Sequence, residues 1–578
     1  MDNKKVLLSV KDLHVKFRVR GRTLTAIRGI SLDLYEGESI AIVGESGSGK
    51  SVFTKTFAGM LESNGYISEG SIIFNDDQLS DTVVKNKRGT VANIAKTLNR
   101  YSKLELGSEI YVQIKALEAE KKAKSSLSAE EEAEISAQKA ELAFKRTEEF
   151  NFKQTIDPKD KAAHKASAEK IAVFDEQIKQ TDLKKKALVA SRKAALKKDS
   201  EYLDGYKTKR AELLAAYKAA IKGEISEETK TRNLIIAKEI YLSVGRYGFV
   251  KRQQYIFKLC AEFKKAFRVG LPVSDDTVRN ELFDKVVFRV KYLDETETVL
   301  HGTCLLNLAK VNYDKDWGQI RGSRIATVFQ DPMTSLNPVI TIGKQITSII
   351  IKHQGCSEIE ARARALELMK KVGIPNAENR FDDYPFQYSG GMRQRIVIAI
   401  ALSCQPKILI CDEPTTALDV TIQAQILKLI KDLQKEFGYT IVFITHDLGV
   451  VANVAERVAV LYAGQVVELG TVEEVFYDPR HPYTWALLSS LPQLAQRNTK
   501  LYSITGTPPS LYNSIVGDAF APRNPHCLKI DTLKEPPMFQ VSETHFAKTW
   551  LLDPRAPKIS KPEAIEDIHE KLKQTFNI

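Results

Sequence analysis

The chain has 578 residues, which is too long for one ordinary domain, so at least two are expected. It has no stretch of 18 apolar residues and no secretory pattern at its start, so we expect any membrane-spanning segments to belong to partners. Six cysteines without a CxxC pair indicate neither a disulfide framework nor a zinc site. The net charge is +12, and this surplus lies within residues 81–315, where acids are interleaved with the bases.

The first chemical motif is a glycine-rich loop that follows a predicted buried strand at residues 39–43. Residues 44–51 match the pattern G-x-x-x-x-G-K-[ST] at every fixed position. In such a loop the backbone amides surround the β-phosphate, Lys50 reaches the β and γ oxygens, and Ser51 can hold Mg²⁺. The loop therefore predicts binding of a nucleoside triphosphate. The contacting residues are predicted to be Gly44, Glu45, Ser46, Gly47, Ser48, Gly49, Lys50, Ser51 and Val52.

The next long segment, residues 81–315, has the composition of long helices. It is rich in Ala, Lys, Glu and Leu, and Pro158 is the only proline between residues 81 and 271. Apolar residues recur at helical spacing without a sustained heptad, so we expect a helical bundle or hairpin and not a long coiled coil. From Val286 onward an alternating pattern predicts a strand that returns the chain to the host sheet. Helix starts are predicted at Ser128–Glu131, at Asp157–Pro158 and at Ser226–Glu228.

A second buried strand, predicted at residues 407–412, ends in two acids. Asp412 is placed to hold Mg²⁺ through water, and Glu413 is placed to polarise the attacking water as a general base. Taken alone, the pattern also fits a strand end with a solvated acidic turn. It is accompanied, however, by further polar segments in a fixed order, namely Gln330, Ser389-Gly390-Gly391, Asp419 and His446.

This order and spacing resemble the ATP-binding subunits of ABC transporters, over residues 1–80 and about 316–525. The resemblance implies ATP as the nucleotide. Gln330 would then contact Mg²⁺ and the attacking water, His446 would be the switch histidine, and Asp419 would belong to the D-loop. The signature residues Ser389, Gly390, Gly391 and Gln394 would cap the γ-phosphate held by the opposite subunit. Without the accompanying motifs, Gln330 and His446 would be ordinary polar residues at strand ends.

Three further segments, residues 328–338, 418–425 and 481–488, look like those of oligopeptide and dipeptide importers. Met333 and Thr334, together with residues 504–511, are similar to the D-type ATPase of these systems. The resemblance implies an F-type ATPase partner, two transmembrane permease subunits and an extracytoplasmic peptide-binding protein. It places the chain at the cytoplasmic face of the cell membrane. Nickel importers share much of the pattern, so the substrate stays open between oligopeptide, dipeptide and nickel.

The expected fold is α/β, an ABC-type P-loop ATPase domain with a mainly parallel sheet and a helical signature subdomain. The predicted domains are the first ATPase part at 1–80, the basic helical insertion at 81–315, the second ATPase part at 316–495 and an irregular C-terminal extension at 496–578. Phe17 is predicted to stack on adenine, with a core aromatic as the alternative.

Two further expectations concern what the chain does not do. A helical insertion also resembles SMC-type repair ATPases acting on nucleic acid, but there it follows the glutamine loop, whereas here it precedes Gln330. The basic residues also lack the stacking aromatics of a nucleic-acid surface. D-type subunits often carry a cysteine motif for an iron–sulfur cluster, and here its three cysteine places hold Asp518, Asn524 and Asp531. Cys527 alone cannot hold a cluster, so none is predicted.

Overall fold

The computed structural model describes residues 4–155, 160–311, 317–416, 418–490, 504, 506–512, 515–562 and 565. The chain divides into two compact units. The host unit comprises Met1–Ile72, Gln154–Ile156 and Val311–Ile578, and the insertion unit comprises Ile73–Lys153 and Asp157–Lys310. Within the described residues, no helix has both the length and the apolar character needed to cross a membrane.

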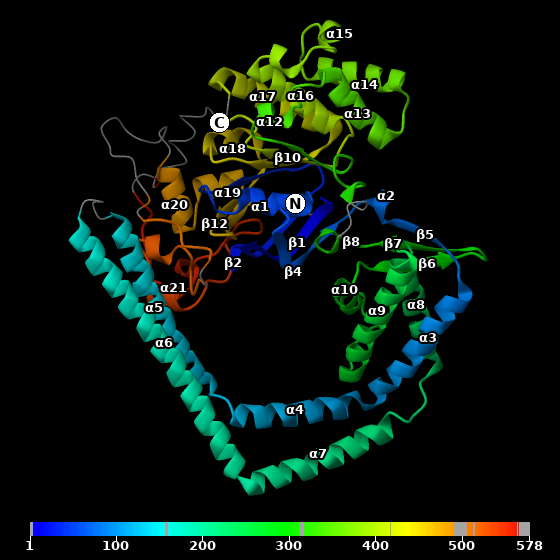
Figure 1. Cartoon of the computed structure of the whole chain (residues 1–578), viewed down its shortest axis with the longest axis vertical. Coiled ribbons are helices and arrows are strands. Elements are labelled where there is room, and N and C mark those ends of the chain that lie inside the picture. Colours follow the sequence, from blue (N-terminus) through cyan, green and yellow to red (C-terminus); the bar gives the residue numbers. More distant parts are fainter. Residues whose placement is uncertain are drawn as a thin grey trace. The chain divides into compact units, whose positions relative to one another are not determined.

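An eight-stranded sheet forms the centre of the host unit, in the order β14-β15-β13-β12-β3-β11-β10-β9 (Figure 1). The strands β12, β3, β11, β10 and β9 are mutually parallel, and beyond β12 each of β13, β15 and β14 pairs antiparallel with the strand before it. Every residue of β3, β11 and β12 is buried, as expected where both faces of a parallel sheet are covered. The bounds are β3 Ser39–Val43, β9 Ile325–Val328, β10 Ile408–Asp412, β11 Thr440–Ile444, β12 Arg457–Tyr462, β13 Gln465–Thr471, β14 Phe539–Gln540 and β15 Phe546–Ala547.

A second sheet has the order β2-β1-β4-β8, with β1 at Val6–Val19, β2 at Arg22–Tyr35, β4 at Gly65–Phe74 and β8 at Leu306–Asn307. The long hairpin β1–β2 turns at Arg20 and Gly21, which both have positive φ values, of 47° and 77°. Two such residues match the right-handed twist of the strands, and Val19 pairs directly with Arg22.

Helices cover the host sheet, and a group of them, α13 to α16, forms the helical subdomain that the sequence predicts (Figure 1). Its buried side chains include Ile346, Ala365 and Ile398. Ser357 and Glu360 form a capping box at the start of α14. The host helices are α1 Lys50–Phe57, α12 Pro332–Ser335, α13 Ile342–Gln354, α14 Glu358–Lys371, α15 Ala377–Arg380, α16 Gly390–Leu402, α17 Val420–Phe437, α18 Leu448–Val454, α19 Val472–Tyr477, α20 Pro482–Ser489 and α21 Lys529–Leu533.

The insertion unit has its own core, in which helices pack beside a three-stranded sheet of order β5-β7-β6. Large buried side chains such as Phe263, Phe267 and Phe283 fill this core. A fully buried ion pair joins Arg289 to Glu239 at 2.9 Å. The elements are α2 Asp77–Ser80, β5 Asp81–Lys85, α3 Arg88–Ser102, α8 Glu227–Ser243, α9 Phe249–Val269, α10 Asp276–Asp284, β6 Val290–Glu295 and β7 Val299–Cys304.

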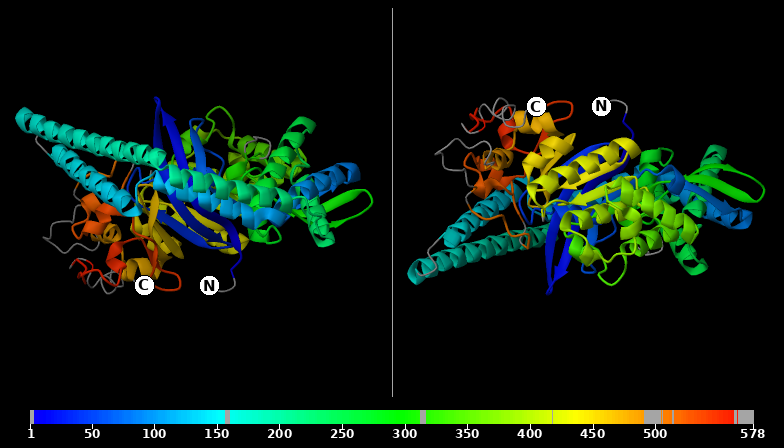
Figure 2. Two further views of the ribbon diagram at one scale, coloured as in Figure 1. Left: turned by 90° about the horizontal axis from the view of Figure 1, so that it is seen from below. Right: turned by 90° about the horizontal axis from the view of Figure 1, so that it is seen from above.

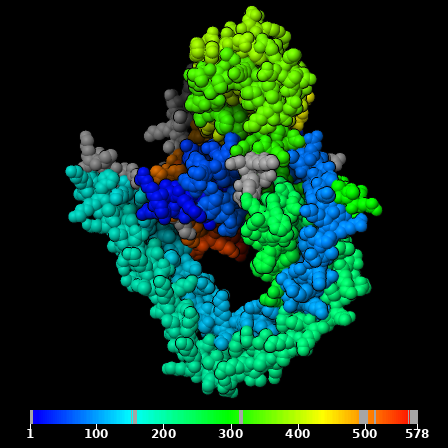
Figure 3. All heavy atoms as spheres, turned by 45° about the vertical axis from the view of Figure 1, so that its right-hand side comes forward, coloured from blue at the N-terminus to red at the C-terminus, as the bar shows by residue number. Residues whose placement is uncertain are grey.

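Four long helices extend from this core, α4 at Ser108–Lys124, α5 at Ala129–Thr155, α6 at Lys161–Lys198 and α7 at Ser200–Ala220. Helices α5 and α6 form an antiparallel hairpin (Figure 2), and α4 lies against α7 (Figure 3). The insertion is therefore built from helical hairpins and a bundle, as its composition predicts.

The structure confirms two of the predicted helix starts. Ser128 and Glu131 exchange hydrogen bonds at the start of α5, and the Ser226 side chain accepts from Thr229 at the start of α8. The predicted start at Asp157–Pro158 lies outside the described residues. Helix α6 begins at Lys161, where the Asp160 side chain accepts from the Ala163 amide.

The strand predicted from Val286 begins four residues later, at Val290, and does not rejoin the host sheet. Val286 and Val287 donate to the Phe283 carbonyl and thereby complete the turn that follows α10. The strand that follows pairs with its sequence neighbour β7, which is the shorter connection. The chain returns through β8 instead, where Leu306 pairs with Phe74 of β4.

Candidate nucleotide-binding and hydrolysis site

The glycine-rich loop connects β3 to α1 and requires glycine at two positions. Gly44 has φ 150°, and a Cβ atom there would lie 2.2 Å from the Leu461 carbonyl oxygen. Gly49 has φ 102°, and a Cβ there would lie 2.9 Å from the Ile27 side chain. The backbone thus adopts a tight turn that only glycine allows, and it ends at the amino terminus of a helix, where an anion is stabilised.

Lys50 is buried within this loop. Its Nζ donates to the carbonyl oxygens of Gly44 at 2.7 Å and Glu45 at 3.0 Å. Burial lowers the pKa of Lys50, and the carboxylates of Glu413, Asp412 and Glu45 oppose this shift. A phosphate group would give the buried ammonium the full counter-charge that carbonyl oxygens supply only in part.

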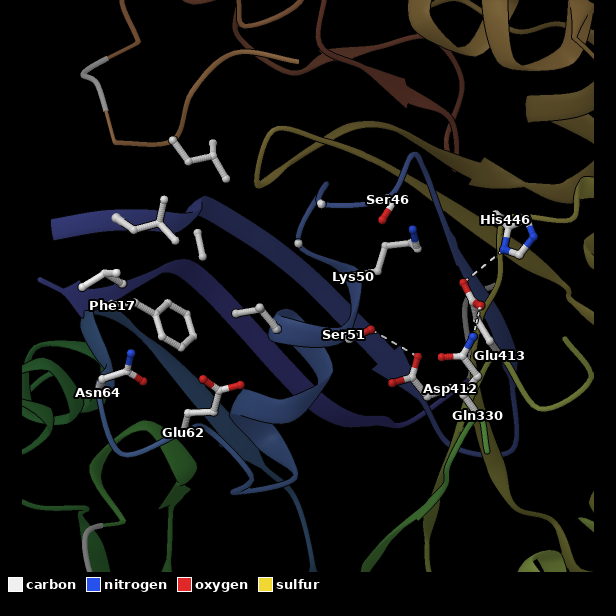
Figure 4. A pocket seen from close by; sticks show the side chains of 17 residues that line it. Phe17, Ser46, Lys50, Ser51, Glu62, Asn64, Gln330, Asp412, Glu413 and His446 are labelled. Atoms are coloured by element: carbon white, nitrogen blue, oxygen red, sulfur yellow. Dashed lines mark hydrogen bonds and ion pairs between the residues drawn. The ribbon is translucent and has the colours of Figure 1, made fainter. Parts of the chain in front are cut away.

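The parallel sheet brings the other polar side chains to the same edge as the loop. Strands β3, β11, β10 and β9 are neighbours, and parallel strands place their carboxyl ends at one edge. Asp412 is the last residue of β10, and its Oδ1 accepts from the Ser51 hydroxyl at 3.2 Å (Figure 4). Burial raises the pKa of Asp412, with the neighbouring Glu413 carboxylate adding to the shift.

Glu413 is the centre of a hydrogen-bonded group at this edge (Figure 4). Its Oε2 accepts from Gln330 Nε2 at 2.9 Å and from the Thr416 hydroxyl at 3.1 Å. Its Oε1 lies 3.1 Å from His446 Nδ1. The Glu413 backbone has φ 46°, a strained value for a residue with a side chain. The three polar side chains therefore fix the direction of one carboxylate.

A pocket of about 610 Å³ contains these groups, a volume within the range of ligand sites. Eleven of the site residues predicted from the sequence line this pocket, namely Phe17, Ser46, Gly47, Gly49, Lys50, Ser51, Val52, Gln330, Asp412, Glu413 and His446. Gly44, Glu45 and Ser48 are not among the lining residues. The Ser48 hydroxyl is buried and lacks a hydrogen-bond partner among the described residues.

The sequence analysis missed six lining residues, Val19, Leu24, Ala26, Glu62, Asn64 and Leu511. The first three extend the surface that Phe17 begins, since Phe17 and Leu24 are cross-strand partners in the β1–β2 hairpin. Alternation along the two strands was a usable signal for them. Nothing near Leu511 in the sequence indicates that it reaches the same pocket as Phe17.

The predicted signature residues and Asp419 do not line this pocket. Ser389 and Gly390 are exposed at the start of α16, and the Ser389 hydroxyl accepts from the Met392 amide at 3.4 Å. Asp419 is exposed at the start of α17. A Cβ at Gly391 would lie 2.7 Å from the Ile422 side chain, so the two helices approach closely there. Gln394 is fully buried, and its amide has no partner among the described residues.

The residues present fit a nucleoside triphosphate with Mg²⁺. The buried ammonium of Lys50 and the backbone of the loop suit the phosphates, and the apolar walls at Phe17 and Leu24 suit a base. The hydroxyl of Ser51, the carboxylate of Asp412 and the amide of Gln330 supply the oxygen atoms that Mg²⁺ prefers.

Comparison with known proteins agrees with this chemistry. The ABC transporter family model matches residues 27–196 and 290–416, more than half of the chain. An oligopeptide transport ATP-binding protein, AmiE of Streptococcus pneumoniae, is 64% identical over 268 residues, 46% of this chain and 76% of that protein. The chain belongs to the ABC transporter ATP-binding family.

Further matches give the branch of this family. The model of the oligopeptide/dipeptide transporter C-terminal region matches residues 467–530. The oligopeptide transport protein OppD of Bacillus subtilis is 56% identical over 286 residues, 49% of this chain and 79% of its own. The dipeptide transport protein DppD of Lactococcus lactis subsp. cremoris is 58% identical over 274 residues, 47% of this chain and 77% of its own. This member of the family is therefore an ABC-type ATPase of the peptide-transporter branch.

Proposed function

We propose that this ABC ATPase powers the import of oligopeptides, together with an F-type ATPase subunit and two transmembrane permease subunits. The observation that carries the proposal is the match of residues 467–530 to the oligopeptide/dipeptide transporter C-terminal region. The relatives AmiE and OppD, both named for oligopeptide transport, support it. An extracytoplasmic binding protein would deliver the peptide to the permease, and the ATPase would act at the cytoplasmic face of the membrane. DppD, a dipeptide transport protein, supports dipeptides as the second candidate substrate.

In this proposal the loop and Lys50 bind the phosphates, and Phe17 with its apolar neighbours receives the adenine. Ser51, Asp412 and Gln330 would hold Mg²⁺, which when bound neutralises phosphate charge. Glu413 accepts a proton from the attacking water, because its carboxylate is held at the sheet edge beside the loop and its Oε1 can accept a further hydrogen bond. Gln330 and His446 orient that carboxylate through the hydrogen bonds at 2.9 Å and 3.1 Å.

The signature residues are proposed to act on the nucleotide of the partner ATPase. Their exposure at Ser389 and Gly390, away from the pocket of their own chain, supports an action in trans. Asp419, which is also exposed, would lie at the same interface. Binding of two nucleotides would close the dimer, and residues after Gln330, from Met333 to Gly343, would pass the closure to the permease.

The predicted insertion at 81–315 is proposed to be an accessory domain, because no residue that lines the nucleotide pocket belongs to it. An insertion whose two ends lie close together is tolerated at modest entropic cost. Here the ends are joined by the pairing of β4 with β8.

A transport assay tests the proposal. Cells that lack this gene should lose uptake of a labelled tetrapeptide, and the wild-type gene should restore it while the Glu413→Gln gene does not. An excess of unlabelled dipeptide separates the candidates, since only a dipeptide importer would be inhibited strongly by it. Unchanged tetrapeptide and dipeptide uptake, or copurification of the chain with nucleic acid in a salt-dependent manner, would contradict the proposal.

A further inference from the structure

Glu45, the second residue of the phosphate loop, is held by groups from distant parts of the host unit. Its amide donates to the Tyr483 hydroxyl at 2.7 Å, and its carbonyl oxygen accepts from Lys50 at 3.0 Å. Its two carboxylate oxygens accept from the Arg523 guanidinium at 2.8 Å and 3.1 Å. A bidentate pair of this kind fixes both the position and the orientation of the carboxylate.

Arg523 lies 478 residues from Glu45 in sequence, in the C-terminal extension, and its side chain is only 4% exposed. It also donates to the Tyr462 hydroxyl at 3.3 Å. Phe520 packs edge-to-face on both Tyr462 and Tyr483, with ring centroids 5.2 Å and 5.4 Å apart. The guanidinium is therefore supported by a rigid aromatic cluster and has little freedom to leave Glu45.

The position of this pair matters for the nucleotide. Ser46 and Gly47, the next two residues after Glu45, line the nucleotide pocket. An unpaired carboxylate at Glu45 would repel the negatively charged phosphates at short range in a partly buried setting. Loss of the pair would also free the first turn of the loop to move, although the amides of this turn must face the phosphates.

We propose that Arg523 is a positioning residue for nucleotide binding, which neutralises and orients Glu45 and so sets the affinity of the phosphate loop for ATP. By this means the C-terminal extension would control a site to which it contributes no phosphate contact. The inference concerns the nucleotide site and does not depend on which peptide is transported.

The test measures the Kd of MgATP for the full-length protein by isothermal titration, with the unfolding temperature of each nucleotide-free variant as the measure of folding. Arg523→Met should raise the Kd about tenfold, as expected when one partner of a buried charge pair is removed. The double variant Arg523→Met/Glu45→Gln should recover most of this loss, because no unpaired carboxylate then remains beside the phosphates. The Kd of Arg523→Lys should lie between those of the wild type and Arg523→Met, because lysine keeps the positive charge but cannot donate two parallel hydrogen bonds to the carboxylate.

A matched control separates positioning from general stabilisation by the extension. Glu535 also joins the extension to the rest of the host unit, through Arg28 at 3.4 Å and Gln465 at 2.7 Å, without touching the loop. Glu535→Gln should therefore leave the Kd within about twofold of the wild type. The proposal is overturned if Arg523→Met binds MgATP as the wild type does, if Glu45→Gln fails to recover its affinity, or if Glu535→Gln weakens binding equally.

Discussion

The parallel sheet of the host unit and the long helices of the insertion unit are stabilised in opposite ways. All residues of β3, β11 and β12 are buried, whereas α7 has no buried residue and α6 buries only Ser167 and Thr181 along its 38 residues. Apolar burial stabilises by about 25 cal/mol per Å² removed from water, and it leaves side chains no alternative packing. The sheet can therefore hold catalytic groups in fixed positions.

In the α5–α6 hairpin, ion pairs replace much of this burial. Among the described side chains, five pairs cross between the two helices, and they are Lys139–Asp182, Arg146–Asp175, Lys170–Glu149, Lys185–Glu132 and Arg192–Glu131. Each is partly exposed, so water screens the attraction between the charges and each pair contributes little to stability. From this difference we expect that a single substitution lowers activity or stability strongly at the sheet edge and only slightly in the hairpin.

The largest effect is expected for Glu413→Gln at the sheet edge. The substitution keeps the shape of the side chain and removes its basicity, so ATP turnover should fall by about 10²-fold or more while ATP binding is retained. Steady-state hydrolysis and nucleotide titration of the purified complex measure the two quantities. Lys50→Ala is the contrasting variant and should weaken binding itself. Turnover of Glu413→Gln above about a tenth of the wild-type rate would show that another group is the base.

A smaller effect, dependent on pH, is expected for Asp518→Asn in the C-terminal extension. Burial raises the pKa of Asp518 from 3.8 to about 7. The folded chain thus binds the carboxyl proton of Asp518 more tightly than the unfolded chain does. The free energy of unfolding therefore falls as the pH rises from about 4 to about 7 and this proton is lost. Asparagine carries no charge and can still accept from the Phe520 amide, which donates to Asp518 at 2.9 Å. The variant should therefore unfold a few degrees above the wild type at pH 8 and close to it at pH 4.

The control for this prediction is Asp553→Asn. Asp553 is paired with Arg555, which lowers its pKa to about 2, so the sign of its contribution is reversed. Its removal should not raise the unfolding temperature at pH 8. Equal stabilisation by both substitutions would indicate a general effect of net charge and not of the buried carboxyl.

In the hairpin, Arg192→Met should have a weak and local effect. Arg192 donates to both carboxylate oxygens of Glu131, at 2.6 Å and 2.5 Å, and to the Ser126 carbonyl at 2.7 Å. Its loss should loosen the start of α5 only slightly, seen as faster amide hydrogen exchange there, with ATP hydrolysis unchanged. The exposed Lys193 is the control, and Lys193→Met should change neither. A loss of global stability would show that the hairpin is more strongly coupled than its surface pairs indicate.

Removal of most of the insertion should change basal ATP hydrolysis by no more than a few-fold. Phe74 pairs with Leu306, so a short Gly/Ser turn can replace residues 75–305 and keep β8. Trp317 stays in place as well, which is necessary because its ring lies over Gly59, where an added Cβ would be 2.4 Å from the ring. A folded variant that failed to bind ATP would show that part of the nucleotide site lies in the insertion.

The smallest expected signal is that of iron. Asp518, Asn524 and Asp531 each accept from a nearby backbone amide, those of Phe520, His526 and Leu528, and so act as turn caps. Anaerobically purified protein should contain no stoichiometric iron and show no absorbance near about 400 nm of the kind that iron–sulfur clusters give. Stoichiometric iron would contradict the assignment of these residues.

The sequence by itself determined the parts that depend on local pattern. The loop from Gly44 to Ser51, the buried strands that precede Gly44 and Asp412, and the helix starts at Ser128 and Ser226 follow from spacing, capping and apolar runs. Asp412 and Glu413 could be named because they follow a buried strand, whereas Gln330 and His446 could be named only through the resemblance to ABC transporter ATPases.

Only the tertiary structure decided which distant groups meet. Leu511 joins Phe17 in one pocket, and Arg523 reaches Glu45, because the sheet brings together segments that are hundreds of residues apart. The chain returns through β8 and not through the strand at Val290, because β8 pairs with β4 whereas the strand at Val290 pairs with β7. Local periodicity determines the conformation of a segment, whereas long-range pairing depends on the burial of apolar side chains that only the assembled core provides.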